Sequence, residues 1–178
     1  KGYYNKPEAT AEAIDPDGWF HTGDIGVIDG DGFLKITDRK KEIIVNSNGK
    51  NIAPAPIESA LKSDPFVSQP VVIGDRRKFL SCLIVPNFEK LKDWAGKNGL
   101  SGLSDEELLK DTRVLQIYQG IIDRWNLNKP HEQVINAFTL LPAELTIEGG
   151  ELTPTLKVKR RIVDQKYKSV IDGLYKGD

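Results

Sequence analysis

The chain has 178 residues, with 25 Lys and Arg, 26 Asp and Glu, and a formal net charge of −1. This length suits one well-buried domain, or one domain plus a piece of a second, and is too short for a complete large metabolic enzyme. A net charge so close to zero excludes an overall field that would draw the protein to nucleic acid or to an anionic membrane, so any anion site has to be local.

The cysteine content and the apolar segments indicate the cellular setting. The chain has a single cysteine, Cys82, which excludes an internal disulfide and suits a reducing cytoplasm. Because Cys82 lies within the apolar run of residues 79–85, we expect a buried structural thiol. No apolar run approaches the roughly 20 residues needed to span a bilayer. The sequence begins at Lys1 and contains no methionine, so we expect a piece of a longer protein.

The first 37 residues predict a short helix followed by a β-hairpin. Residues 5–15 contain an alanine-rich helical pattern that ends at a Pro- and Gly-containing turn. Residues 25–28 and 33–37 read as short strands joined by the turn sequence DGDG. That turn resembles the start of a calcium loop, but Phe33 occupies the next alternate position and no glutamate closes the loop. We therefore expect a plain turn and no metal site.

A change in composition predicts a domain boundary after this hairpin. The charged strip DRKKE occupies residues 38–42, and an apolar segment and a polar loop follow it in residues 43–51. This stretch is the natural place for a domain boundary, with a β-rich fragment before it and a second domain after it.

The second domain contains the elements of a small sheet. Residues 57–62 suit a short helix. The branched apolar runs 71–73 and 79–85 predict an antiparallel hairpin at the centre of the sheet, and residues 134–141 predict a further strand. Between the first two runs lies the basic tip of residues 76–78, Arg-Arg-Lys, which we expect to be solvated.

Helical spacing dominates residues 87–130 and the end of the chain. Ser104 and Glu107 form the sequence pattern of a capping box. Apolar residues at helical spacing mark helices on either side of it, and residues 158–174 predict one final amphipathic helix. We expect three aromatic residues in this region to be core residues: Trp94, Tyr118 and Trp125. The order of elements predicts an α+β fold, with a small antiparallel or mixed sheet covered by helices.

Three segments together resemble the AMP-forming acyl-CoA synthetases, within the larger group of adenylate-forming enzymes. They are residues 18–24 (GWFHTGD), 38–44 (DRKKEII) and 152–160 (LTPTLKVKR). The third segment and the helical insertion at about residues 87–130 are most similar to the long-chain fatty acid–CoA ligases. The resemblance implies that residues 38–178 form the mobile C-terminal lid domain and that residues 1–37 end the large N-terminal domain.

The resemblance implies nucleotide-binding and hinge roles near this boundary. Asp24 matches the acid that holds the ribose hydroxyls of ATP and of the acyl-adenylate, a task for which two acceptor oxygens are suited. Arg39 matches an arginine near the ribose and phosphates, and Asp38 matches the hinge about which the lid swings. Without the resemblance, Asp24 reads as a turn residue and the charged strip as a solvated face.

The resemblance also implies two roles within the lid. Gly49 matches a glycine on the loop that approaches the pantetheine channel of CoA, although residues 45–48 (VNSN) stand where many relatives have a lysine and an aromatic residue. Lys157 matches the catalytic lysine that reaches the acyl carboxylate and the α-phosphate during adenylation. A mobile cation suits this step because the reaction joins two anions.

The implied function is that of the C-terminal part of a long-chain fatty acid–CoA ligase. Its substrates and cofactors are fatty acid, ATP with Mg²⁺ held by the N-terminal domain, and CoA. We expect the isolated chain to be inactive, because only Asp24, Arg39 and Lys157 of the site are present. We also expect a cytoplasmic protein, transient contact with membranes through its fatty substrates, and no binding of nucleic acid.

Two alternatives stay open at this point. The first is the lid of another adenylate-forming ligase that acts on an aryl or amino acid. The second is a non-enzymatic binding module that uses two basic segments, residues 76–78 and residues 157–161.

Overall fold

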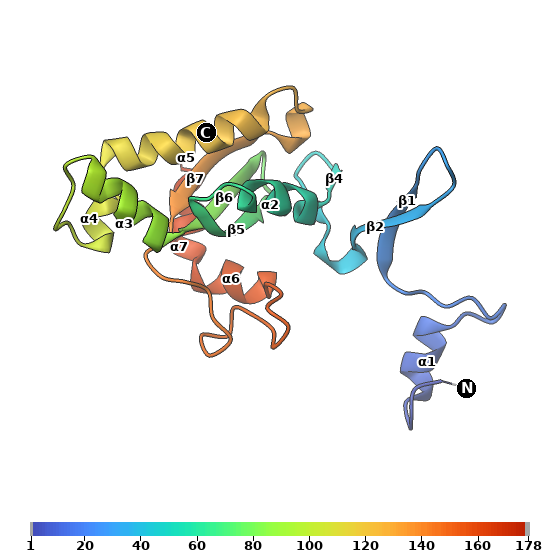
Figure 1. The fold of residues 1–178 in the computed structure, drawn as a ribbon. Coiled ribbons are helices and arrows are strands. Elements are labelled where there is room, and N and C mark those ends of the chain that lie inside the picture. Colours follow the sequence, from blue (N-terminus) through green and yellow to red (C-terminus); the bar gives the residue numbers. More distant parts are fainter. Residues whose placement is uncertain (1, 177–178) are drawn as a thin grey trace. The chain divides into compact units, whose positions relative to one another are not determined.

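The computed structural model describes residues 2–176 and divides into two compact units, Lys1–Ile43 and Ile44–Asp178 (Figure 1). The division between Ile43 and Ile44 lies one residue after the charged strip. The assignment of residues 1–37 and 38–178 to two domains of a larger enzyme stays a prediction.

The first unit is a helix followed by a two-stranded hairpin. Its elements are α1 (Pro7–Ala13), β1 (Asp24–Ile28), β2 (Leu34–Arg39) and the short 3-10 helix η1 (Lys40–Glu42). The strands pair antiparallel, with a register shift between Ile25 and Gly26. In the connecting turn, the Asp29 carboxylate accepts hydrogen bonds from the backbone N–H groups of Asp31 (3.0 Å) and Phe33 (2.8 Å). The Asp29 carboxylate therefore organises the turn, and the predicted hairpin is confirmed.

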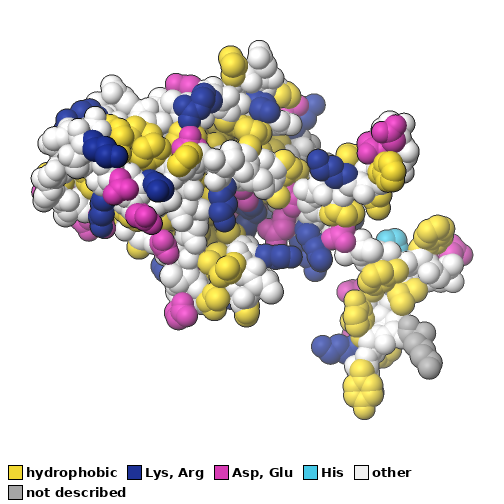
Figure 2. All heavy atoms as spheres, in the orientation of Figure 1, with side chains coloured by type: hydrophobic (Ala, Val, Ile, Leu, Met, Phe, Trp, Pro, Cys, Tyr) yellow, Lys and Arg dark blue, Asp and Glu magenta, His cyan; other side chains and the backbone are white. Residues whose placement is uncertain are grey.

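The first unit buries very little apolar surface. Among its described residues, Asp38 alone is buried. Figure 2 shows hydrophobic side chains spread over the surface of this part of the chain. The exposed large hydrophobic residues are Tyr3, Tyr4, Trp19, Phe20, Val27, Ile28, Phe33, Leu34 and Ile36.

The second unit contains a mixed three-stranded sheet. The strands of this sheet are β5 (Val67–Ile73), β6 (Leu80–Pro86) and β7 (Ile135–Leu140), and the short strands β3 (Ile44–Val45) and β4 (Asn51–Ile52) form a separate antiparallel pair in the same unit. Its helices are α2 (Pro54–Lys62), α3 (Phe88–Lys97), α4 (Asp105–Leu108), α5 (Thr112–Asn126), η2 (His131–Gln133), α6 (Arg160–Lys166) and α7 (Lys168–Leu174). The sheet order is β5-β6-β7, with β6 antiparallel to β5 and parallel to β7. The predicted α+β fold class is confirmed.

Successive side chains of each strand point to opposite faces of this sheet, and each face carries an apolar cluster. Helices therefore cover both faces (Figure 1). One cluster contains residues of α2, α3 and α5, and its sheet residues include Val72, Cys82 and Ile84. The other contains Val163 of α6 and Ile171 of α7, and its sheet residues include Val71, Leu83 and Val85. The central strand β6 is buried along its whole length.

Several local predictions for this unit are confirmed. In the capping box, the Ser104 hydroxyl accepts from the Glu107 N–H, and the Glu107 carboxylate accepts from the Ser104 N–H. Tyr118 is fully buried, and Trp94 and Trp125 pack against the first cluster. Cys82 is also fully buried. Burial raises the pKa of its thiol well above the ordinary range, which leaves the sulfur in its unreactive form.

The prediction of one final helix over residues 158–174 is wrong in two respects. Val158 pairs with Leu152 in an isolated β-bridge, so the helix begins only at Arg160. Tyr167, with φ −102° and ψ 18°, then separates α6 from α7. No proline or glycine lies at this point. The partly buried Tyr167 packs against the second cluster, and the Lys166 ammonium group forms an ion pair with the buried Glu151. Tertiary contacts are therefore present where the helix is interrupted.

Candidate functional site

Asp24 and Arg39 lie side by side in the first unit. Asp24 begins β1, Arg39 ends β2, and the two residues are partners in the strand register. The Arg39 Nε atom lies 2.8 Å from Asp24 Oδ1. Gly23 precedes Asp24 with φ +73°, a conformation that favours glycine, and its carbonyl accepts from the Lys40 N–H at 2.8 Å. The resemblance named both residues, but their direct pairing had not been predicted.

This pair remains open to solvent. The Arg39 side chain is 61% exposed and the Asp24 side chain 26%. Exposed ion pairs contribute only about 0–1 kcal/mol to stability, so a ligand can displace one partner at little cost. An ionised acceptor beside a cation has the chemistry to bind a hydroxyl-bearing, negatively charged molecule such as a nucleotide.

Asp38 differs from its neighbours because it is buried. It is 8% exposed, and its Oδ1 accepts the Arg39 backbone N–H at 2.7 Å. The residue stands near the end of β2, just before the short helix η1 that precedes the second unit. Asp38 thus lies at an element end a few residues before the boundary between the units, and its role as a hinge stays a prediction.

Gly49 lies in the tight loop between β3 and β4. The Asn46 side chain accepts from the N–H groups of Asn48 (3.0 Å) and Lys50 (2.9 Å), and the Gly49 N–H donates to the Asn46 carbonyl at 2.9 Å. Gly49 has φ +74°, and a Cβ there would meet nothing within 4 Å. The backbone conformation therefore favours glycine, and no other part of residues 2–176 crowds the position.

Lys157 is presented on a small hairpin of the second unit. The Leu152–Val158 bridge closes this hairpin. Thr153 holds Lys157 twice, because its N–H donates to the Lys157 carbonyl (2.8 Å) and its Oγ1 accepts the Lys157 N–H (3.0 Å). Leu156 adopts the left-handed conformation, with φ +58°. Lys157 is exposed, and within residues 2–176 its ammonium group has no carboxylate partner.

The prediction that the tip of residues 76–78 is simply solvated is wrong for Arg77. Its Nη2 lies 2.6 Å from Asp172 Oδ1, and its guanidinium stacks 4.8 Å from the centre of the Tyr175 ring. The Arg77 carbonyl also accepts the Ser47 N–H at 2.9 Å. Arg77 therefore connects the end of the chain to the loop that carries Gly49. Arg76 next to it is solvated, with 92% of its side chain exposed.

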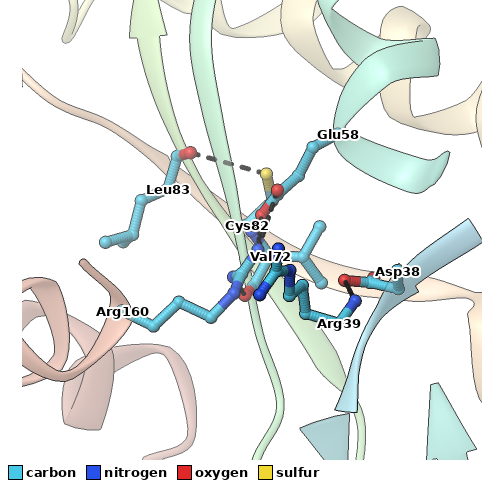
Figure 3. A network of polar contacts seen from close by, with 7 residues as sticks. All are labelled: Asp38, Arg39, Glu58, Val72, Cys82, Leu83 and Arg160. Atoms are coloured by element: carbon cyan, nitrogen blue, oxygen red, sulfur yellow. Dashed lines mark hydrogen bonds and ion pairs between the residues drawn. The ribbon is translucent and has the colours of Figure 1, made fainter. Parts of the chain in front are cut away.

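A further ion pair that the sequence analysis missed joins Glu58 and Arg160. One guanidinium nitrogen of Arg160 lies 2.7 and 2.8 Å from the two Glu58 carboxylate oxygens, and the other donates to the Val72 carbonyl at 3.0 Å (Figure 3). The only sequence signal was the position of Arg160, three residues after Lys157. Its partners lie 88 and 102 residues away and left no local pattern.

Two further properties of the described residues bear on function. Within residues 2–176, no three His, Cys, Asp or Glu side chains gather in a way that could hold a metal ion. Among the same residues, no helix is both long enough and apolar enough to cross a bilayer.

The fold is that of a domain from the adenylate-forming enzymes. The adenylation domain of a carboxylate reductase from Mycobacterium chelonae is similar with a TM-score of 0.76 and 27% identity, over 98% of this chain and 26% of that chain. The A domain of the carboxylic acid reductase from Segniliparus rugosus, solved with AMP and a co-purified carboxylic acid, gives a TM-score of 0.73 at 28% identity over the same shares.

The chain belongs to the family described as AMP-binding enzyme C-terminal domain, which matches residues 41–178. It is 43% identical over 175 residues to the long-chain-fatty-acid–CoA ligase FadD15 of Mycobacterium tuberculosis, covering 98% of this chain and 29% of the relative. It is 40% identical over 194 residues to human long-chain-fatty-acid–CoA ligase ACSBG1, covering 98% of this chain and 26% of the relative. The predicted resemblance to long-chain ligases is confirmed, and the chain spans less than a third of these relatives.

Proposed function

We propose that this chain is the C-terminal part of a long-chain fatty acid–CoA ligase. The observation that carries the proposal is the 40–43% identity to two such ligases along 98% of the chain. The similarity thus includes both units, with Asp24 and Arg39 in the first and Lys157 in the second. The full-length enzyme would convert a fatty acid, ATP and CoA into acyl-CoA, AMP and pyrophosphate.

In the proposed reaction, a carboxylate oxygen of the fatty acid attacks the α-phosphorus of ATP. The bond to the β-phosphate oxygen breaks, and pyrophosphate leaves. The sulfur of CoA then attacks the acyl carbon, AMP departs as the leaving group, and the thiol proton is released. Mg²⁺ would neutralise phosphate charge in the first step, and we assign its site to the part of the enzyme outside this chain.

Asp24 and Arg39 would bind the nucleotide. The Asp24 carboxylate is suited to accept hydrogen bonds from the two ribose hydroxyls, because it offers two ionised acceptor oxygens. The Arg39 guanidinium beside it is suited to the phosphates. The solvent exposure of their ion pair supports this role, because the pair can open without a large loss of stability.

Lys157 would act as the catalytic residue of adenylation. Its ammonium group would stabilise the negative charge that gathers when the carboxylate and the phosphate approach each other. The exposed position, without a carboxylate partner among residues 2–176, supports this role because no internal ion pair has to be broken first. Gly49 would serve the second step, in which its loop lets the thin pantetheine arm of CoA pass close to the backbone.

We also propose the domain roles and the setting. Residues 1–37 would end the large N-terminal domain, residues 38–178 would form the mobile lid, and Asp38 would be its hinge. The helical region of about residues 87–130 would be an insertion in the lid. The chain alone would be inactive. The single cysteine favours a cytoplasmic enzyme, with transient membrane contact when it collects fatty substrates.

A second candidate is an adenylate-forming enzyme with a different acid or acceptor. It is favoured by the similarity to the A domain of a carboxylic acid reductase at 28% identity. The lower identity makes it the weaker proposal. A binding module built on the basic tip of residues 76–78 is weaker still, because Arg77 is already engaged by Asp172 and Tyr175.

The test uses the full-length enzyme with Lys157→Ala and, as a matched control, Lys159→Ala. Pyrophosphate release from palmitate and ATP reports adenylation, and palmitoyl-CoA formation from supplied palmitoyl-AMP reports thioester transfer. We expect Lys157→Ala to lower adenylation by about 100-fold or more, since a transition-state charge contact is lost, while transfer is retained. Lys159→Ala should leave both steps unchanged. Full adenylation by Lys157→Ala would overturn the assignment, and activity with benzoate but not with palmitate would favour the second candidate.

A further inference from the structure

Lys157 is exposed, yet the hairpin that carries it is anchored at both ends by partly or fully buried ion pairs. On one side, Glu151 precedes the hairpin, is 1% exposed, and binds the ammonium group of Lys166. On the other side, Arg160 follows it and binds Glu58. The flexible Lys157 side chain, which would stabilise the transition state of adenylation, is thus attached to a backbone that is fixed on either side.

We propose that Glu58 and Arg160 are positioning residues for Lys157. This inference rests on the proposed function, because it assigns a role to the pair through the adenylation step. Figure 3 shows how the Arg160 side chain reaches across to Glu58 of α2 and to the backbone of Val72 in β5.

Hydrogen bonds link Arg160, Glu58 and Val72 to one another. Arg160 donates to both Glu58 carboxylate oxygens and to the Val72 carbonyl, while the Val72 N–H donates to Glu58 Oε1 at 2.8 Å. The side chains of Arg160 and Glu58 are only 19% and 16% exposed. A pair so shielded from water is more rigid and more selective in geometry than a surface pair.

The anchor lies on the rigid part of the second unit. Glu58 is on α2, whose Ile57 and Leu61 are core residues, and α2 packs against β5. Glu58 and Val72, to which Arg160 donates, are therefore parts of the sheet and of the helix packed against it. Since α6 begins at Arg160, the same side chain also fixes where the hairpin ends and the helix starts.

A displacement of Arg160 would change the position of Lys157, because the two residues are close in the chain. Only Val158 and Lys159 separate them. Val158 pairs with Leu152 across the hairpin, and the Lys159 N–H donates to the Glu151 carbonyl at 2.7 Å. A shift at Arg160 therefore tilts the hairpin about its second anchor at Glu151. A misplacement of about 1 Å at a reacting centre costs on the order of 100-fold in rate, so a modest tilt has a large effect.

A purely structural role makes a different prediction from a positioning role. Loss of a structural pair lowers stability and affects both half-reactions alike. Loss of a positioning pair lowers the kcat of adenylation, where Lys157 acts, and leaves thioester transfer from supplied palmitoyl-AMP intact. The positioning effect also has to vanish when Lys157 itself is absent, because the two residues then share one mechanism.

The experiment uses the full-length enzyme with Arg160→Lys and Glu58→Gln. Lysine keeps the charge of Arg160, but its single ammonium group cannot reproduce the planar contacts to both Glu58 and the Val72 carbonyl. Glutamine keeps the shape of Glu58 and removes its charge. We expect each variant to lower the kcat of adenylation by about 10-fold or more, with the KM for ATP and the transfer step changed by less than about 2-fold.

The control is Arg124→Lys. Arg124 forms a 2.6 Å pair with Asp64, 60 residues away, in the same unit. It matches Arg160 in residue type and in linking distant segments, but none of its hydrogen bonds within residues 2–176 leads to the Lys157 hairpin. We expect both half-reactions of Arg124→Lys to stay within about 2-fold of the parent enzyme. Thermal unfolding of every variant identifies those that fold. If Arg160→Lys does not fold, Glu58→Gln tests the positioning role.

The double variant Lys157→Ala with Arg160→Lys separates the two proposals. We expect it to adenylate no more slowly than Lys157→Ala alone. A further loss of adenylation in the double variant, multiplied onto that of Lys157→Ala, would overturn the positioning role. So would an equal loss of both half-reactions in Arg160→Lys and Glu58→Gln, or unchanged adenylation by these two variants. If Lys157→Ala alone adenylates normally, the proposed function fails first, and that result is distinguishable from the others.

Discussion

The two units of this chain obtain their structure in different ways. The first has a hydrogen-bonded hairpin but leaves nine large hydrophobic side chains exposed, and Asp38 alone among its described residues is buried. In the second unit, the sheet lies between two apolar clusters. Backbone pairing alone stabilises a two-stranded hairpin only marginally, whereas burial on both faces stabilises a sheet strongly. The first unit therefore has little apolar burial of its own to stabilise it, whereas the second has two apolar clusters.

The largest expected effect of this difference is on hydrogen exchange of the chain as it stands. We expect amides of β6 to exchange only through global opening, with a free energy of about 5 kcal/mol or more. Amides of β1 should open at less than about 2 kcal/mol, because little apolar surface is lost when that hairpin opens. Mass spectrometry of peptides from the two strands measures both values. Equal protection of β1 and β6 would contradict the comparison.

Core truncation sharpens the comparison at the level of single side chains. Leu83 is fully buried in the second cluster, so Leu83→Ala should lower the free energy of unfolding of the second unit by about 2–5 kcal/mol. Ile36 in the first unit is 55% exposed, and Ile36→Ala should cost less than about 1 kcal/mol. Urea unfolding followed by tryptophan fluorescence and circular dichroism gives both numbers. Similar losses for the two variants would show that Ile36 is buried in solution.

A buried carboxylate of the second unit predicts a pH dependence. Burial acts to raise the pKa of Glu151, but hydrogen bonds from the Lys166 ammonium group and from backbone N–H groups outweigh burial and hold the pKa below its usual value. The unfolded chain then binds the proton more readily. The stabilising contribution of Glu151 is therefore complete above about pH 4.3 and is lost as the pH falls through the lower, folded value.

The measurement compares the parent chain with Glu151→Gln between pH 3 and pH 8. At neutral pH the parent should be more stable by on the order of 1–2 kcal/mol, and this advantage should shrink below about pH 4. Glu148→Gln is the matched control, since Glu148 is exposed. An advantage that stays constant over the whole range would mean that Glu151 does not act through its charge.

The contrast between the units also explains what could be predicted from the sequence. Both hairpins, the capping box at Ser104 and the aromatic core residues follow from period-2 or helical patterns and from turn residues close together in the chain. The same patterns gave the α+β class. The site residues came from motif resemblance, and the position of each motif on a strand end or hairpin is consistent with local turn chemistry.

The remaining features depend on contacts between distant residues. Arg77 is held by Asp172 and Tyr175, and Arg160 is held by Glu58, and neither pairing leaves a local signal. For this reason a basic tip was misjudged as wholly solvated, and the anchors of the Lys157 hairpin were missed. The interruption of the last helix at Tyr167 has the same origin, because packing in the second cluster and not a helix-breaking residue accompanies it.

The smallest expected effect on stability belongs to the exposed pair of the first unit, and it separates stability from function. Asp24→Asn keeps the shape of the side chain and removes its charge, so it should change the free energy of unfolding by less than about 1 kcal/mol. In the full-length enzyme, we expect the same change to weaken ATP binding by about 10-fold or more, since ionised acceptors make the stronger hydrogen bonds. Asp31→Asn, at the far end of the same hairpin, is the control and should alter neither quantity. Calorimetric titration with ATP measures the affinity. If Asp24→Asn bound ATP normally, the pair with Arg39 would be an ordinary surface contact, and the nucleotide site would have to be sought on other residues.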